Sequence, residues 1–468
     1  MKSLWPSLAQ VAAILLGGAA AGYALAPALV PASAPRAERA AWGFALGLAL
    51  LALPLPPAFL LGLSPVLAIA LVSALSLAAA RFSVHRQRVS ALAPRQAGVW
   101  ALSKPLHAFL VLLILFGVLV YSLRALAEPM WSNDFLAIWG LKGKTIFGAA
   151  GIPPRLFADP SLGFSHPEYP LGLPLLYASV SFLLGRWDDH ALALLYPFFQ
   201  IATLLALAGW LRRRGASATL ALAAVALLAQ FEPLYSAFQT GLADIPFSFA
   251  ALLFGSALVD VLDGTDPQAA RRLALAAFLA VSTKNEGLLL IAAGAALALF
   301  AGRGARAAAR SALAAVVVPA VLLTGIGRLW KGSPPLRDFD FSLLTRPQQL
   351  FPRAGSAIRT AISEIVLPAW PGLLCLVILA GSGRSIPRGN RLLALSLICT
   401  LAYLLIPSLA VLGPEWLIRT SFARTVSALA PLTAAAIASR LTSLRDRSDL
   451  RLRRTGSRLG RMRPRPRA

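Results

Sequence analysis

Apolar runs dominate the chain and are separated by short segments that hold most of the charged residues. A bilayer core about 30 Å thick requires a helix of roughly 20 apolar residues. The first run follows Lys2, as a signal peptide would, but its length and the many later runs favour a retained helix. The sequence predicts spans near residues 8–30, 40–56, 58–80, 106–127, 190–211, 216–231, 245–262, 311–330, 364–381, 391–412 and 425–440.

Composition supports the same fold class. Hydrophobic residues make up 58% of the 468 residues and charged residues 13%, whereas soluble domains contain about 45–50% and about 25%. This excludes water-soluble enzymes, disordered chains and disulfide-stabilised scaffolds. Cys375 and Cys399 both lie in apolar runs, so no disulfide framework is indicated. We therefore expect an all-α polytopic membrane protein.

The net charge of +25 is concentrated in short loops and in the C-terminal tail. Loops rich in Lys and Arg stay on the cytoplasmic side of a membrane, and this placement argues against nucleic-acid binding. We expect the tail to lie near anionic membrane lipid. The segments assigned to the cytoplasm are 81–104, 212–214, 302–310, 384–391 and the residues after Arg440.

The opposite side then holds loops 128–169, 232–244, 331–363 and 413–424. Residues 170–185 are apolar but too short to cross, so we expect an interfacial helix along the outer membrane surface. The first outer loop would then run from Glu128 to His190. Function is expected there, because the other loops are tight.

Three regions are expected along the chain. Residues 1–104 are N-terminal transmembrane helices with a basic cytoplasmic loop, 105–440 a catalytic transmembrane core, and 441–468 a basic cytoplasmic tail. Within the core, 270–301 reads as a hairpin that rises from inside and carries Lys284 and Glu286. Ionised groups at membrane depth need a polar cavity. No phosphate-binding loop, dinucleotide fingerprint or metal motif is found.

Two stretches of the first outer loop carry candidate chemistry. Asp134 begins an amphipathic segment and is interpreted either as a helix cap or as a general base for a hydroxyl acceptor. Farther on, Ser165-His166-Pro167-Glu168-Tyr169-Pro170 offers donors, an acid and an aromatic face that suit a sugar. The prolines alone also explain this stretch as a backbone constraint, and His166 as an ordinary hydrogen-bonding residue.

Later outer segments add Asp244, Arg419 and Arg424. Asp244 is either a helix cap or a second acid that orients the acceptor or pairs with Lys284. The two arginines fit binding of a phosphate, or anchoring to lipid headgroups. All of these residues converge on one outward-facing cavity if the predicted sidedness holds.

The order of these motifs resembles the GT-C class of integral-membrane glycosyltransferases. The branch that contains protein O-mannosyltransferases and the lipid A aminoarabinose and galacturonic acid transferases is the most similar. The resemblance rests on the outer acid, the His-Pro stretch, Gly241-Leu242-Ala243-Asp244 and Thr283-Lys284-Asn285-Glu286-Gly287, and covers about residues 105–440.

The resemblance implies a GT-C-like helix bundle that takes polyprenyl-phosphate sugars and transfers with inversion on the non-cytoplasmic face. Asp134 occupies the position of the loop acid that acts as base or orients the acceptor, and His166 and Tyr169 match the His-Pro stretch. Many members carry an Asp-Glu pair where this chain has Asn133-Asp134-Phe135. The chain also has no large soluble outer domain at its C-terminus, which argues against a large protein acceptor.

The leading hypothesis is an inverting glycosyltransferase of the cell envelope, in a bacterial inner membrane with its active site facing outward. It would move a monosaccharide from a polyprenyl-phosphate donor to a hydroxyl of a glycan or lipid acceptor. No cofactor is expected, since two outer acids would hold a divalent ion only weakly. Asp134 is the catalytic candidate, and the binding candidates are His166, Glu168, Tyr169, Asp244, Lys284, Glu286, Arg419 and Arg424.

Two alternatives stay open. Lys284 and Glu286 between broken helices also suit a secondary transporter or a flippase of lipid-linked sugars. The absence of an inverted repeat and the crowding of polar residues at one face argue against it. A non-catalytic assembly protein is the third reading.

Overall fold

The computed structural model describes residues 4–31, 33–88, 105–264, 266–300, 307, 310–318, 339–363 and 388–442. These residues form helices and no strand, with one isolated bridge between Phe339 and Ala410. Six helices in this part of the chain are long and apolar enough to cross a membrane, or seven if one bent pair counts as a span. The predicted class, an all-α polytopic membrane protein, is confirmed.

The helices of spanning length follow the predicted apolar runs closely. They are Leu4–Ala28, Arg36–Leu60, Pro105–Ala125, Asp189–Arg213, Asp244–Asp263 and Arg391–Leu409, with Pro414–Ser427 and Ala430–Thr442 as the pair bent by 47°. The predicted span 364–381 and most of 311–330 lie outside the described residues.

Two of the predicted spans form apolar helices that are shorter than expected. The run at 58–80 corresponds to α4 (Pro65–Arg88), whose apolar part is Pro65–Ala79. The run at 216–231 forms α11 (Ala218–Ala229), which has 12 residues and is therefore about 18 Å long. α11 packs on α5 (Pro105–Ala125) and α10 (Leu195–Arg213).

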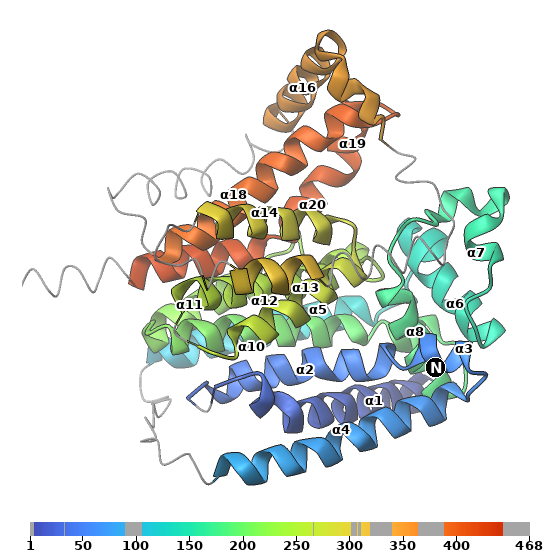
Figure 1. Cartoon of the computed structure of the whole chain (residues 1–468), viewed down its shortest axis with the longest axis vertical. Coiled ribbons are helices and arrows are strands. Elements are labelled where there is room, and N and C mark those ends of the chain that lie inside the picture. Colours follow the sequence, from blue (N-terminus) through green and yellow to red (C-terminus); the bar gives the residue numbers. More distant parts are fainter. Residues whose placement is uncertain are drawn as a thin grey trace, which may run out of the picture.

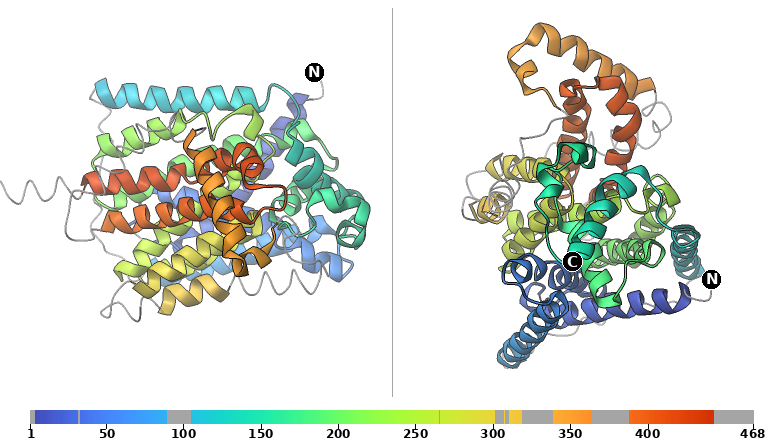
Figure 2. Two further views of the ribbon diagram at one scale, coloured as in Figure 1. Left: turned by 90° about the horizontal axis from the view of Figure 1, so that it is seen from above. Right: turned by 90° about the vertical axis from the view of Figure 1, so that its right-hand side faces the viewer.

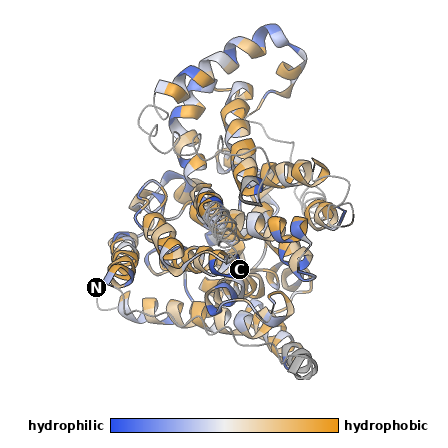
Figure 3. Ribbon diagram, turned by 90° about the vertical axis from the view of Figure 1, so that its left-hand side faces the viewer, coloured by the Kyte–Doolittle hydropathy of each residue, from blue (hydrophilic) through white to orange (hydrophobic). Residues whose placement is uncertain are grey.

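Helix α12 (Asp244–Asp263) forms the centre of the bundle. All its residues from Asp244 to Leu262 are buried, as expected for a helix that is apolar on every face. α10, α13 (Ala269–Thr283) and α18 (Arg388–Leu405) pack around it. The bundle helices run roughly horizontally in Figure 1, and Figure 3, which looks along them, shows that they are mostly coloured as hydrophobic.

The N-terminal helices pack directly on this core. α1 (Leu4–Leu25) and α2 (Arg36–Ala52) approach so closely at Gly22 and Gly43 that a Cβ on either would overlap the backbone of the other helix. Gly209 of α10 meets the backbone of Glu38 in the same way. Small residues of this kind let membrane helices make close van der Waals contact.

The apolar segment 170–185 forms a helix, as expected. It is α8 (Gly172–Leu184), and the nine consecutive residues Leu173–Ser181 are all buried. Its predicted position along the outer membrane surface stays a prediction. α8 packs against α1, α2, α6 (Gly140–Ala149) and α13, which supply the burial that the sequence alone does not reveal.

The expected hairpin is present as α13 and α14 (Glu286–Phe300), joined at Lys284 and Asn285. α13 runs alongside α12: Arg272 pairs with Asp260 near one end, and Lys284 pairs with Asp244 at the other. Lys284 is therefore level with the first residue of a spanning helix. The expected position of Lys284 at membrane depth stays a prediction.

One end of the bundle holds a buried network of ion pairs. Arg213 binds Glu38 through two nitrogens, at 2.7 and 2.8 Å, and Asp260 at 2.5 Å. Arg272 binds Asp260 at 2.9 Å. Arg214 and Arg391 pair with Asp263 in the same region. We call this end, which includes the predicted cytoplasmic cluster 212–214, the Asp260 end.

One helix extends sideways from the bundle. α16 (Pro347–Ala361) lies beside α19 (Pro414–Leu417) and runs across the direction of the bundle helices (Figure 2, left). Its surface mixes polar and apolar residues, in contrast to the bundle helices (Figure 3). α16 belongs to 331–363, one of the loops assigned to the side opposite the basic loops.

Candidate functional site

A cavity of about 1200 Å³ lies at the end of the bundle that carries Asp244, opposite the Asp260 end. We call it the Asp244 cavity. Residues from α2, the segment 134–176, the beginning of α12, the α13–α14 turn and the region 403–425 line it. The site therefore combines segments far apart in the sequence. Asp244 and Asp260 are sixteen positions apart on α12, or about 24 Å along its axis.

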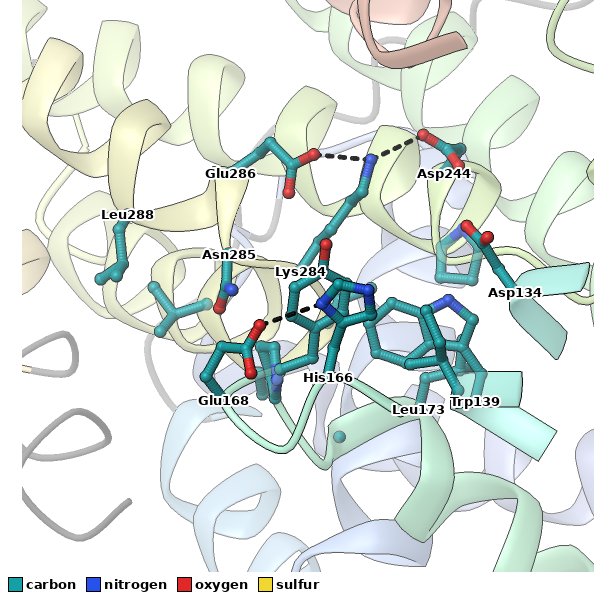
Figure 4. Close-up of a pocket in the computed structure, with 18 of the residues that line it drawn as sticks. Asp134, Trp139, His166, Glu168, Leu173, Asp244, Lys284, Asn285, Glu286 and Leu288 are labelled. Carbon is teal, nitrogen blue, oxygen red and sulfur yellow. Dashed lines mark hydrogen bonds and ion pairs between the residues drawn. The ribbon is translucent and has the colours of Figure 1, made fainter. Parts of the chain in front are cut away.

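Five charged residues form a continuous chain in this cavity, which we call the charged chain. Asp134 pairs with Arg424 at 2.9 Å, and Arg424 lies 3.3 Å from Asp244. Lys284 then pairs with Asp244 at 2.9 Å and with Glu286 at 2.8 Å. Figure 4 shows Lys284 between the carboxylates of Glu286 and Asp244, with Asp134 beside them. The signs alternate along the chain, and both ends are carboxylates.

Local backbone geometry places the two residues at one end of this chain. Asp134 immediately precedes η2 (Phe135–Trp139), a turn of π-helix that continues into α6. Its side chain makes no capping hydrogen bond. Asp134 therefore pairs with Arg424 and does not cap the helix. Arg424 follows a second π-helical turn, η9 (Ile418–Phe422). π-helical turns inside α-helices occur frequently at functional sites.

Asp244 is the first residue of α12, and Ala243 holds the capping position. Of the two interpretations of Asp244, pairing with Lys284 is therefore the one that the structure supports, and a helix cap is not. A carboxylate in the first turn is favoured by the positive end of the helix dipole. Asp244 is only 1% exposed, and the two cations beside it compensate the cost of burying its charge.

The predicted sugar-binding stretch also lines the cavity. The Glu168 carboxylate accepts a hydrogen bond of 3.1 Å from the His166 Nδ1, and the His166 ring stacks on Tyr169 at 4.6 Å between centroids. Trp139 lies 5.5 Å from the same tyrosine ring. Adjacent aromatic rings and polar groups of this kind suit the faces and hydroxyls of a sugar. Figure 4 shows His166 and Glu168 below Lys284, and Asp244 above them.

Lys142 supports this stretch and was missed in the sequence analysis. His166 has a positive φ of 50°, a conformation that costs energy for a residue other than Gly. The Lys142 ammonium donates to the His166 carbonyl oxygen at 2.6 Å and lies 5.8 Å from the Tyr169 ring centroid. Lys142 is completely buried. Its spacing within an amphipathic segment gave only a weak signal, since lysine there usually faces water.

Two further cavity residues were missed, Asn285 and Tyr403. The Asn285 amide nitrogen and the Tyr403 hydroxyl are buried and have no hydrogen-bond partner among the described residues. Buried polar atoms are normally paired, so these donors are available to a ligand. The signal in the sequence was weak. Asn285 lies between the two charged residues of the hairpin turn, and Tyr403 lies in an otherwise apolar run.

Arg419 does not join the site. Its side chain is exposed and does not line the cavity, whereas Arg424, five positions later, does. Positions five apart on a helix lie on different faces. The expectation that both arginines bind one phosphate is therefore wrong for Arg419.

The remaining wall of the cavity is mostly apolar, with Phe249, Phe278, Leu279 and Leu288 among its residues. Four lining side chains are also largely exposed: Phe164, Phe341, Leu412 and Trp416. The cavity thus combines a charged region with a long apolar surface, which suits an amphiphilic ligand.

In the described part of the chain, no group of three or more His, Cys, Asp or Glu side chains is placed to hold a metal ion. No known protein family, curated protein or solved structure matches the sequence or the fold in systematic comparisons.

Proposed function

We propose that this membrane protein is an inverting glycosyltransferase of the GT-C type. It takes a monosaccharide from a polyprenyl-phosphate donor and transfers it to a hydroxyl of a glycan or lipid acceptor on the non-cytoplasmic face. The observation that carries the proposal is the Asp134–Arg424 pair in a large amphiphilic cavity. This arrangement supplies a carboxylate for the acceptor and cations for a phosphate in one place.

The chemical step is a single displacement. The acceptor oxygen attacks the anomeric carbon while its proton passes to Asp134 as general base. The bond between the anomeric carbon and the phosphate oxygen breaks, and its electron pair leaves with the polyprenyl phosphate. The phosphate thereby gains one negative charge, which Arg424 and Lys284 stabilise. Attack from the face opposite the leaving group inverts the configuration.

The other cavity residues bind the substrates. His166, Glu168 and Tyr169 contact the sugar through hydrogen bonds and ring faces, and Asp244 and Glu286 hold Lys284 and Arg424 in position. The polyprenyl tail occupies the apolar surface that includes Phe249, Phe278 and Leu288. The reaction requires no cofactor in this scheme. The basic tail after Arg440 contacts anionic lipid on the cytoplasmic side.

The test is sugar transfer by the purified protein. Wild type, Asp134→Asn and Arg419→Ala are incubated with labelled polyprenyl-phosphate sugars and a cell-envelope lipid fraction, and transfer is quantified. We expect activity in wild type and Arg419→Ala, and at least a ~100-fold loss in Asp134→Asn, in the range typical for loss of general base catalysis. Full activity of Asp134→Asn removes this residue from the mechanism. Movement of intact lipid-linked sugar across proteoliposomes without transfer supports a flippase instead.

A further inference from the structure

The charged chain contains more carboxylates than cations. Arg424 and Lys284 are each bound to two carboxylates, and Asp244 bridges them. A phosphate that enters this site therefore meets cations that are already neutralised, beside carboxylates that repel it. Binding of the phosphate requires that one carboxylate gives up its cation.

The terminal carboxylates are the ones that can leave. In the described part of the chain, Asp134 pairs with Arg424 alone, and its side chain is 30% exposed. Asp244 pairs with both cations and is 1% exposed. A partly exposed ion pair is weak because water screens it, whereas separation of a buried pair leaves an uncompensated charge and is strongly unfavourable. Asp134 is therefore displaced more easily than Asp244.

Donors without partners point to an oxyanion as the incoming group. Among the described residues the Arg424 Nε has no hydrogen-bond partner, although it lies 3.3 Å from Asp244. The Asn285 amide nitrogen and the Tyr403 hydroxyl are also unpaired among the described residues. All three residues line the Asp244 cavity. A phosphate offers several acceptor oxygens and can satisfy such donors together, and arginine binds it through two parallel hydrogen bonds.

We propose that Arg424 binds Asp134 before the donor arrives and binds the donor phosphate afterwards. This inference rests on the proposed function. When the phosphate binds Arg424, Asn285 and Tyr403, it displaces the Asp134 carboxylate, which is then available to take the proton of the acceptor. The base is held by Arg424 until the donor arrives, so donor binding precedes activation of the acceptor. Asn285 and Tyr403 are phosphate-binding residues in this scheme.

The test measures binding of polyprenyl phosphate itself, without a sugar, to the purified protein in nanodiscs. Asp134→Asn removes the competing charge but keeps an oxygen for Arg424, so the dissociation constant is expected to fall about tenfold, because the phosphate no longer competes with a carboxylate. Tyr403→Phe is expected to raise it about tenfold, because the phosphate loses a charge-assisted hydrogen bond. Melting temperatures confirm that each variant is folded.

Glu168→Gln is the matched control. It removes a carboxylate that lines the same cavity but pairs with His166 rather than with Arg424. The proposal requires that Asp134→Asn tightens binding clearly more than Glu168→Gln does. An equal fall of the dissociation constant in both variants overturns the proposal that Asp134 and the phosphate exchange at Arg424, and shows only a general effect of charge. Unchanged binding in Asp134→Asn also overturns it, while binding to wild type still supports the proposed function. No binding to wild type contradicts the proposed function itself.

Discussion

Asp134 and Arg424 are 290 positions apart in the sequence and form an ion pair of 2.9 Å, each at the edge of a π-helical turn. Asp134 precedes the turn Phe135–Trp139, and Arg424 follows the turn Ile418–Phe422. A π-helical turn inserts one residue into a helix and rotates the residues beyond it. Both helices therefore use an irregular turn next to the residue that they contribute to the same ion pair.

Arg424→Ala tests the importance of this pair for transfer. In the proposed mechanism the variant lacks the cation that stabilises charge on the leaving phosphate, and loss of one such group typically lowers kcat about 10²–10³-fold. The measurement is kcat with a labelled polyprenyl-phosphate sugar. Arg419→Ala is the matched control, because Arg419 is exposed and five positions away. Equal losses in the two variants contradict the assignment of Arg424.

Lys142→Met tests how the His166 turn is supported. The variant leaves the His166 carbonyl without the ammonium that donates to it at 2.6 Å, and an unsatisfied buried group costs about 1–3 kcal/mol. We expect a lower melting temperature and a higher KM for the donor, with a smaller change in kcat. A change in melting temperature with no change in KM restricts Lys142 to a structural role.

His166→Gly separates the backbone of this turn from its ring. Glycine adopts a φ of 50° without strain, so the melting temperature is expected to stay close to that of wild type. The stacking on Tyr169 and the contact with Glu168 are lost, so donor binding is expected to weaken. A strongly destabilised His166→Gly protein shows that the ring holds the loop together and contradicts a role limited to the substrate.

The ion pairs at the Asp260 end are expected to determine stability rather than activity. Asp260 contacts Arg213 and Arg272 and is buried. Asp260→Asn leaves buried cations without full compensation, which typically costs about 3–5 kcal/mol. The measurement is the melting temperature in detergent, with Glu232→Gln as an exposed control. A melting temperature unchanged by Asp260→Asn shows that water or lipid compensates these charges.

The sequence predicted the spans well because hydrophobic length is a local property of the chain. It also predicted that Asp134, Asp244, Lys284 and Arg424 come together, since the first, second and fourth were assigned to outer segments and Lys284 to a hairpin that reaches the same cavity. The burial of α8 was not predicted, because it depends on α1, α2 and α13, which are distant in sequence. A helix buried in a bundle and a helix that lies on a lipid surface are rich in the same apolar residues, so the sequence does not distinguish them.

The site residues that were missed share a physical reason. Asn285 and Tyr403 are neutral, and neutral polar residues in turns or apolar runs are common in helices that bind nothing. Their significance arises from missing hydrogen-bond partners, a property of the tertiary structure alone. Lysine in an amphipathic segment usually faces water, whereas Lys142 is buried and donates to the His166 carbonyl oxygen.

Sidedness is tested directly by labelling of single cysteines in a background without Cys375 and Cys399. Trp416→Cys lies at the Asp244 cavity, where the tryptophan is 52% exposed, and Arg271→Cys lies near the Asp260 end on an exposed position. The positive-inside rule places basic segments in the cytoplasm. A membrane-impermeant maleimide is therefore expected to label Trp416→Cys in intact cells and Arg271→Cys only after permeabilisation. Labelling of Arg271→Cys in intact cells, with Trp416→Cys protected, reverses the orientation and places the cavity in the cytoplasm.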